Sequence, residues 1–107
     1  MTDRLPGDPP SPYELRYGFS RVIRAGGFVL IGGTTSVTPD GVVLGETPYE
    51  QTVEILGKLL HELGRAGCGP ADVIQTRLYV TDITRADEVG RAHGEVFAAH
   101  RPLMTMV

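Results

Sequence analysis

The chain has 107 residues, of which 41% are hydrophobic, and 13 acidic against 10 basic residues give it a formal net charge of −3. This length and apolar content fit one compact domain and exclude a second. The acidic balance and the dispersed arginines argue against a nucleic-acid-binding surface. The single cysteine, Cys68, excludes an internal disulfide and a cysteine-rich metal centre and fits a cytoplasmic location.

Residues 1–16 are rich in proline and charged residues and contain no apolar run, so they resemble neither a signal peptide nor a membrane span. We expect them to form a flexible lead-in, because they carry too little apolar surface to offset the entropy lost on ordering. Residues 17–107 are then the single folded domain. We expect no membrane association, no metal and no cofactor.

Two short β-prone runs, Phe19–Arg24 and Phe28–Ile31, flank an Ala-Gly-Gly sequence, which predicts a β-hairpin. Gly32 and Gly33 follow the second run directly. Paired glycines at such a place mark a bulge, a strand end or a close approach of a ligand to the backbone. The Pro-Asp-Gly sequence at residues 39–41 predicts a turn in a further short arm.

A helix is predicted to begin at residues 47–50, Thr-Pro-Tyr-Glu, which combine an N-cap threonine, a proline at the first helical position and a glutamate three residues after the cap. An apolar stripe with helical spacing follows, and Gly67 marks the end. Gly57 and Gly64 lie inside this helix and each weaken it by up to about 1 kcal/mol relative to alanine. We expect a close contact with a strand to compensate.

The stretch from residue 73 to residue 82 alternates between an apolar and a polar face, which predicts a strand. The apolar face carries Ile74, Thr76, Leu78 and Val80, and the other face carries Val73, Gln75, Arg77, Tyr79 and Thr81. Helical patterns on both sides of this strand predict that helices cover its apolar face. The polar face then meets water, a ligand or another subunit.

A second helix is predicted from an N-cap at Thr84 to about His100, because Pro102 restricts the residue before it. Residues 103–107 predict the start of a strand, and we expect further residues to belong after Val107. The order is ββ(β)αβαβ, an α+β fold in which right-handed crossovers place both helices on one face of a mixed sheet. A homo-oligomer would cover the other face.

Several stretches in this order resemble a known family. They are Phe19–Gly26, the strand that ends at Gly32 and Gly33, Glu50–Thr52, Gly67 with Asp72–Ile74, Thr76–Asp82, and Val96–Phe97 with His100–Pro102. As an ordered set they resemble the RidA/YjgF family of imine/enamine deaminases over residues 17–107. The resemblance implies a chorismate-mutase-like fold, here without its last strand, and a homotrimer whose sheets close into a barrel with clefts between subunits. Gln75, Arg77 and Tyr79 would face the barrel interior.

Family members hydrolyse reactive imines to 2-keto acids and ammonia without a cofactor. The resemblance implies a deaminase-like hydrolase that acts on an imine, an enamine or a related small carbonyl compound. Gly33 would polarise the bound carbonyl or imine through its backbone N–H, and a hydroxyl group from Thr34 or Thr35 would orient the water.

Five further positions match the family's substrate-binding residues but differ in type. Phe19, Gly32, Gly90, Met104 and Met106 stand where family members carry a tyrosine, a serine, an asparagine, an arginine and a cysteine. The arginine holds the substrate carboxylate in the family, and a thioether carries no charge. The alternative interpretation is therefore a non-catalytic trimeric protein that binds a small molecule or acts in regulation. A third reading, ribonuclease action, is opposed by the acidic balance.

Two other polar residues are assigned structural roles. Arg77 is expected to serve an intersubunit ion pair or hydrogen-bond network. His93 lies on the apolar stripe of the second helix, so we expect a packed, hydrogen-bonded histidine rather than an acid–base group.

Overall fold

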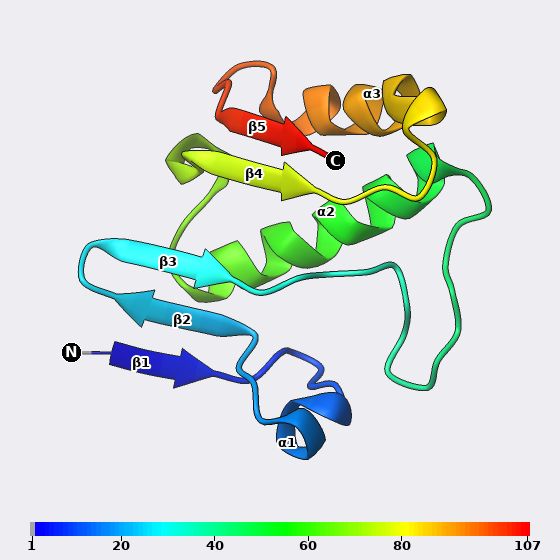
Figure 1. Cartoon of the computed structure of the whole chain (residues 1–107). Coiled ribbons are helices and arrows are strands. Elements are labelled where there is room, and N and C mark those ends of the chain that lie inside the picture. The colour runs from blue at the N-terminus through cyan, green and yellow to red at the C-terminus, as the bar shows by residue number, and fades with distance from the viewer. Residues whose placement is uncertain (1) are drawn as a thin grey trace.

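The computed structural model describes residues 2–107 and has α+β architecture (Figure 1). Its strands are Thr2–Leu5 (β1), Val22–Ala25 (β2), Phe28–Ile31 (β3), Gln75–Leu78 (β4) and Leu103–Met106 (β5). Its α-helices are Tyr13–Tyr17 (α1), Pro48–Arg65 (α2) and Ala86–Phe97 (α3), and its 3₁₀ turns are Pro70–Asp72 (η1) and Ile83–Arg85 (η2). From β2 onward the strands and long helices follow the predicted order.

The predicted hairpin is confirmed. Strands β2 and β3 pair antiparallel with Ala25 opposite Phe28, and Gly26 takes a positive φ of 60° in the turn between them. The further arm around residues 39–41 reduces to one isolated bridge between Val37 and Val43.

Residues 1–16 differ from the predicted lead-in, because they contain β1 and most of α1. Strand β1 pairs antiparallel with β2, with Thr2 opposite Ala25 and Leu5 opposite Val22. Backbone hydrogen bonds to an open strand edge can hold a segment that offers little apolar surface, and such hydrogen bonds leave no mark in the amino-acid composition. Met1 lies outside the described residues.

The strands form two sheets rather than one continuous mixed sheet. Strands β1, β2 and β3 make an antiparallel sheet, while β4 and β5 pair in parallel. Strands β3 and β4 lie next to one another with helix α2 behind them (Figure 1), but no strand of residues 2–107 bridges their facing edges. The predicted single mixed sheet is therefore divided into two sheets, whose strands β3 and β4 face each other without pairing.

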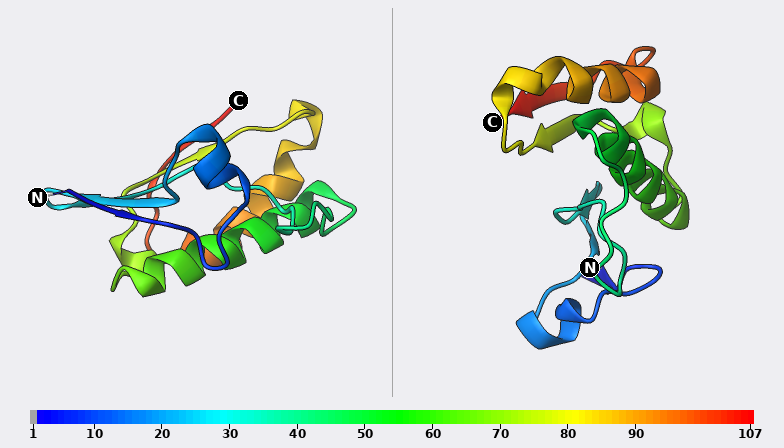
Figure 2. Two further views of the ribbon diagram at one scale, coloured as in Figure 1. Left: turned by 90° about the horizontal axis from the view of Figure 1, so that it is seen from below. Right: turned by 90° about the vertical axis from the view of Figure 1, so that its right-hand side faces the viewer.

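Both long helices lie on the same side of the strands, as predicted (Figure 2). Leu56 of α2 packs with Ala92 and Phe97 of α3 to form the buried core. On β4, Thr76 and Leu78 are half-buried, whereas Gln75 and Arg77 are exposed, as is Tyr79 after the strand, so the predicted alternation is confirmed over these residues. It fails before the strand, where Ile74, predicted on the covered face, is 65% exposed and Val73 packs against the core. No helix among the described residues is both long enough and apolar enough to cross a bilayer.

Helix α2 has the predicted ends. The Thr47 hydroxyl accepts a hydrogen bond from the Glu50 N–H at 3.1 Å, and the Glu50 carboxylate accepts one from the Thr47 N–H at 3.1 Å. Gly67 follows the helix with φ of +78°. Gly57 and Gly64 contradict one expectation, because both are exposed and an added Cβ at either would meet nothing within 4 Å.

The start of the second helix also differs from the prediction. Thr84 does not cap α3, because it lies inside η2, and Arg85 stands at the N-cap position of α3 without a side-chain cap hydrogen bond. Asp82 caps η2: its carboxylate accepts hydrogen bonds from the Thr84 N–H at 3.1 Å and from the Thr84 hydroxyl at 2.5 Å. These two hydrogen bonds lower the pKa of Asp82. The turn η2 therefore comes first, and α3 ends at Phe97, before His100.

Candidate functional site

The glycine pair that follows β3 presents a free backbone donor. Gly32 N–H continues the pairing of β3 with β2 by donating to the Arg21 carbonyl at 2.8 Å. Gly33 N–H donates no hydrogen bond to the described residues, and an added Cβ at Gly33 would meet nothing within 4 Å. Gly33 therefore exposes an N–H group that an outside acceptor can reach.

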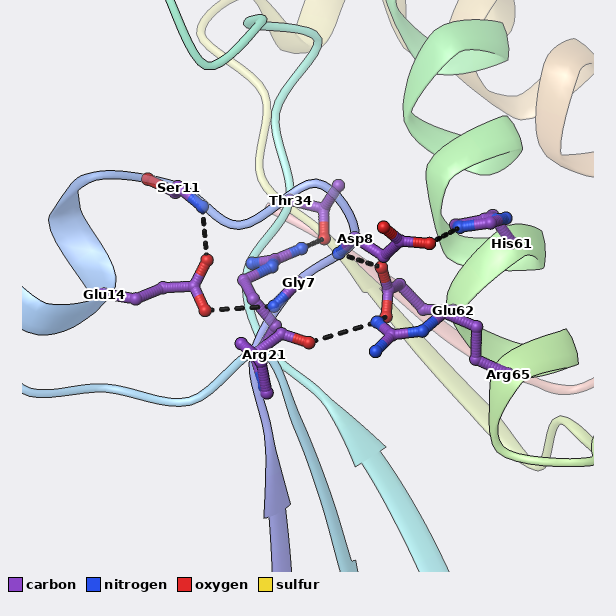
Figure 3. Close-up of polar contacts among 10 residues, drawn as sticks. Gly7, Asp8, Ser11, Glu14, Arg21, Thr34, His61, Glu62 and Arg65 are labelled. Atoms are coloured by element: carbon purple, nitrogen blue, oxygen red, sulfur yellow. Dashed lines mark hydrogen bonds and ion pairs between the residues drawn. The ribbon is translucent and has the colours of Figure 1, made fainter.

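The Arg21 side chain reaches from the start of β2 to this loop (Figure 3). Its Nη1 donates to the Gly33 carbonyl, and its Nη2 donates to the Thr34 hydroxyl oxygen at 2.6 Å. The same hydroxyl donates to the Gly32 carbonyl at 3.0 Å. Because the Thr34 proton is already engaged, Thr34 has no free hydroxyl donor. The exposed Thr35 side chain makes no hydrogen bond to residues 2–107, so its hydroxyl group remains free to donate.

A second cation approaches the loop from helix α2. Lys58 Nζ donates to the Thr35 carbonyl at 2.6 Å and to the Val37 carbonyl at 2.7 Å. Burial lowers the pKa of Lys58, and the nearby charge of Arg21 lowers it further. Arg21 and Lys58 therefore hold the loop from two elements and lie close enough to repel one another.

Neither Arg21 nor Lys58 is among the site residues predicted from the sequence. One signal could have found Arg21: in the predicted hairpin, the residue before Val22 falls opposite the residue after Ile31, which is Gly32. Lys58 gave a weaker signal as the only lysine in the chain.

The segment before α1 is tied down behind Arg21 by two buried carboxylates (Figure 3). Glu14 and Glu62 are each only 5% exposed. The Glu14 carboxylate accepts from the backbone N–H groups of Gly7, at 3.0 Å, and of Ser11. The Glu62 carboxylate on α2 accepts from the Asp8 N–H at 3.0 Å. We call residues 6–14 the strap. The strap leads from β1 into α1, and its hydrogen bonds to Glu62 and Arg65 hold it against α2.

Two contacts reinforce the junction between the strap and α2. Arg65 Nη1 donates to the Glu62 carboxylate at 2.7 Å and to the Pro6 carbonyl at 3.0 Å. His61 lies 3.0 Å from the Asp8 carboxylate. The buried Glu62 charge is thus paired and hydrogen-bonded, as burial of a carboxylate requires.

Phe19 lies beside this region with its ring half-exposed. It lines an open groove of about 880 Å³ between the strap, α1 and the turn at residues 39–40, whose walls are mainly apolar. Other residues that line the groove include Leu5, Pro12, Leu15 and Pro39. The carbonyl oxygen of Ser20, the residue after Phe19, lies 3.6 Å from the position of a Cβ added to Gly32. Phe19 therefore belongs to the same part of the molecule as Gly32, Gly33, Thr34 and Thr35, and we call these five residues the loop group.

The remaining expected site residues lie in another part. Met104 and Met106 pair with Thr76 and Leu78 of β4 and share their helix-facing side. Thr76 is hydrogen-bonded to His93 on α3 at 2.8 Å, and Gly90 precedes His93 by one turn. We call Gly90, Met104 and Met106 the edge group.

One chain does not bring the two groups together. Strand β5 pairs with β4 on the side away from β3 (Figure 1), so the edge group lies beyond β4 from the loop group. The loop group offers an amide donor and a hydroxyl, and Arg21 and Lys58 add two cations beside it, an arrangement suited to an anion or a polarised carbonyl oxygen. Among the described residues, no cluster of three or more histidine, cysteine or acidic side chains is arranged to hold a metal ion.

Known proteins resemble the chain over most of its length. The family model described as endoribonuclease L-PSP matches residues 12–107. An uncharacterised protein of Streptomyces coelicolor is 37% identical over 97 residues, which cover 91% of this chain and 72% of that protein. A RutC family protein of Aquifex aeolicus is 25% identical over 79 residues, which cover 74% of this chain and 63% of that protein.

A solved structure agrees with these relatives. The crystal structure of Rv2704 from Mycobacterium tuberculosis, a member of the YjgF/YER057c/UK114 family, is similar with a TM-score of 0.85 and 36% identity. The similarity covers 100% of this chain and 83% of that one. Because the family model spans residues 12–107 and these relatives agree with it, the chain belongs to the RidA/YjgF family, as its motifs predicted.

Proposed function

We propose that this protein is a deaminase-like hydrolase that acts on reactive imines, enamines or related small carbonyl compounds in clefts between the subunits of a homotrimer. The observation that carries the proposal is the free N–H of Gly33 at the end of β3, in open space. A fixed backbone N–H stabilises negative charge that develops on a substrate oxygen or nitrogen.

Hydrolysis in this cleft needs only a positioned water. Water adds to the carbon of the C=N bond, the nitrogen takes up a proton, and the C–N bond then breaks to release ammonia and leave a carbonyl group. Thr35 supplies the free hydroxyl that orients the water, while Thr34 fixes the loop through Arg21 and Gly32. The expectation that either threonine could orient the water thus narrows to Thr35.

The trimer is supported by the separation of the loop group from the edge group. A cleft that contains both requires the loop group of one copy and the edge group of another. The face of the strands away from the helices also carries apolar side chains, with Phe28 61% exposed and Leu30 57% exposed. Contact with neighbouring copies would remove this apolar surface from water.

The test follows ammonia release from an imine that an amino-acid oxidase generates in situ. Imines also hydrolyse spontaneously, so the rate in buffer alone is the baseline. The hydrolase is expected to release ammonia faster than this baseline. The trimer is expected to sediment at three times the chain mass. Rates equal to buffer for imines from several amino acids would overturn the assignment.

One observation favours a second candidate, a non-catalytic trimer that binds a small molecule. Phe19, Met104 and Met106 are all apolar, so a cleft that they share would prefer an uncharged or aromatic ligand. Saturable binding of such a ligand, without any acceleration of imine hydrolysis, would support this candidate against the hydrolase.

The endoribonuclease description of the family model is not carried over to this chain. A net charge of −3 opposes binding to a phosphate backbone. RNA binding that weakens steeply with added salt would contradict this choice.

A further inference from the structure

Arg21 and Lys58 are two neighbouring cations without an anionic partner among residues 2–107. The ion pairs among residues 2–107 join His61 to Asp8, Arg65 to Glu62 and Arg85 to Glu88. Neither Arg21 nor Lys58 takes part in them. Both side chains are half-buried, so water screens their repulsion less than it would at an exposed site.

Both cations keep unused donors. A guanidinium has five N–H groups and an ammonium has three. Arg21 donates to Gly33 and Thr34, and Lys58 donates to two backbone carbonyls, so three N–H groups of Arg21 and one of Lys58 remain. The free N–H of Gly33 lies in the same loop. These donors come from the residue before β2, from α2 and from the loop, and no acceptor in the described part of the chain binds them.

The nearest carboxylates are already occupied. The Glu14 carboxylate faces Arg21 across Gly7 but accepts two backbone N–H groups of the strap. The Glu62 carboxylate is paired with Arg65. Glu54 raises the pKa of Lys58, but its effect is smaller than those of burial and of Arg21. The positive charge beside Gly33 is therefore left for a ligand.

We propose that Arg21 and Lys58, next to the Gly33 N–H, form a binding site for the carboxylate of a small metabolite and leave that N–H for the reacting group. This inference rests on the proposed function, because it places an acid group beside the reacting centre. Arg21, just before β2, and Lys58, on α2, would also supply the positive charge that Met104 does not provide. A carboxylate fits because its two oxygens match the planar fork of an arginine, and one more donor from Lys58 completes the contact.

Binding of a charged and a neutral probe tests the site. Pyruvate and its neutral amide, pyruvamide, have the same shape and differ in charge, and their dissociation constants for the full chain can be measured by NMR titration. The native protein is expected to prefer pyruvate about tenfold or more, as charge-assisted hydrogen bonds imply. Arg21→Gln and Lys58→Gln should each reduce this preference severalfold, because they weaken the binding of pyruvate more than that of pyruvamide.

Two further variants separate binding from folding. Arg24→Gln removes the same charge three residues further along the chain, in β2, and the Arg24 side chain also donates to a backbone carbonyl, that of Ala66. It should leave the preference unchanged. Arg21→Lys keeps the charge and should restore part of the preference that Arg21→Gln loses. A loss of preference in Arg24→Gln equal to that in Arg21→Gln would overturn the site.

Three outcomes decide the proposal. Equal affinity of the native protein for pyruvate and pyruvamide would overturn it, and so would inorganic phosphate that displaces pyruvate at lower concentration, because the site would then be built for phosphate. A pyruvate preference that depends on Arg21 and Lys58 would support it even if imine hydrolysis is absent. The proposed function can thus fail separately from this inference.

Discussion

Thr76 Oγ1 and His93 Nε2 lie 2.8 Å apart and join β4 to α3. The His93 ring is buried and packs on Phe97 with the ring centroids 4.7 Å apart. The predicted role of His93 as a packed, hydrogen-bonded residue agrees with this contact. Burial lowers the pKa of His93, because an imidazolium loses solvation there.

This shift predicts a loss of stability in acid. The unfolded chain, with a histidine pKa of about 6.5, binds the proton more readily than the folded chain does. The free energy of unfolding should therefore fall as the pH drops below the unfolded pKa, and His93 should contribute no pH dependence well above it. Urea unfolding at a series of pH values measures this, and His93→Gln should show a smaller decrease. An equal decrease in both proteins would contradict the assignment.

Gly57→Ala and Gly64→Ala should each stabilise the protein. Both glycines are exposed in α2 with open space around them, and alanine gains up to about 1 kcal/mol over glycine inside a helix. Gly67→Ala is the matched control and should destabilise, because Gly67 has φ of +78°. Urea unfolding measures all three variants. Destabilisation by Gly57→Ala would show that the position packs against something.

Gly33→Pro should abolish most of the proposed hydrolysis, because proline has no N–H to donate. Loss of one such donor lowers the catalytic rate constant by about 10² to 10³ in well-studied hydrolases. Gly33→Ala keeps the N–H, and its Cβ meets nothing within 4 Å, so its activity should stay near the native value. The rate of ammonia release measures the difference. Equal activity in the two variants would exclude the N–H as a catalytic group.

Leu30→Glu should dissociate the proposed trimer. Leu30 is paired with Ile23 on the face opposite Val22, which is buried, so it points away from the helices. A charge introduced there would have to be desolvated in the assembly. Gly57→Glu adds the same charge on the exposed side of α2 and should leave the mass unchanged. Sedimentation equilibrium gives both masses, and an undiminished mass for Leu30→Glu would place the interface elsewhere.

The sequence predicted the elements whose signals are local. The capping box of Thr47 and Glu50, the alternation along β4 and the turn at Gly26 each depend on residues close together in the chain, and the structure contains all three. The family was recognised because its motifs occur in a fixed order. Local sequence patterns were therefore sufficient to predict these elements and the family.

The features that were missed depend on distant contacts. Strand β1 exists because the edge of β2 accepts it, and Glu62, from another helix, holds the strap. Arg21 and Lys58 are 37 positions apart in sequence and meet only at the loop. Amino-acid composition and local pattern carry no information on contacts between residues that are far apart in the chain, so these contacts could not be predicted from them.

Gly7 shows how far the influence of the strap extends. A Cβ at this position would lie 2.9 Å from the Cγ of Arg21 and 3.1 Å from the Pro9 carbonyl oxygen, too close for either neighbour to remain in place. Even an alanine at this position would therefore displace the Arg21 side chain, whose guanidinium lies beside Thr34. The strap thus supports an arginine that contacts the loop at the open end of the β2–β3 hairpin, and replacement of Gly7 should weaken ligand binding even though Gly7 is not a ligand-binding residue.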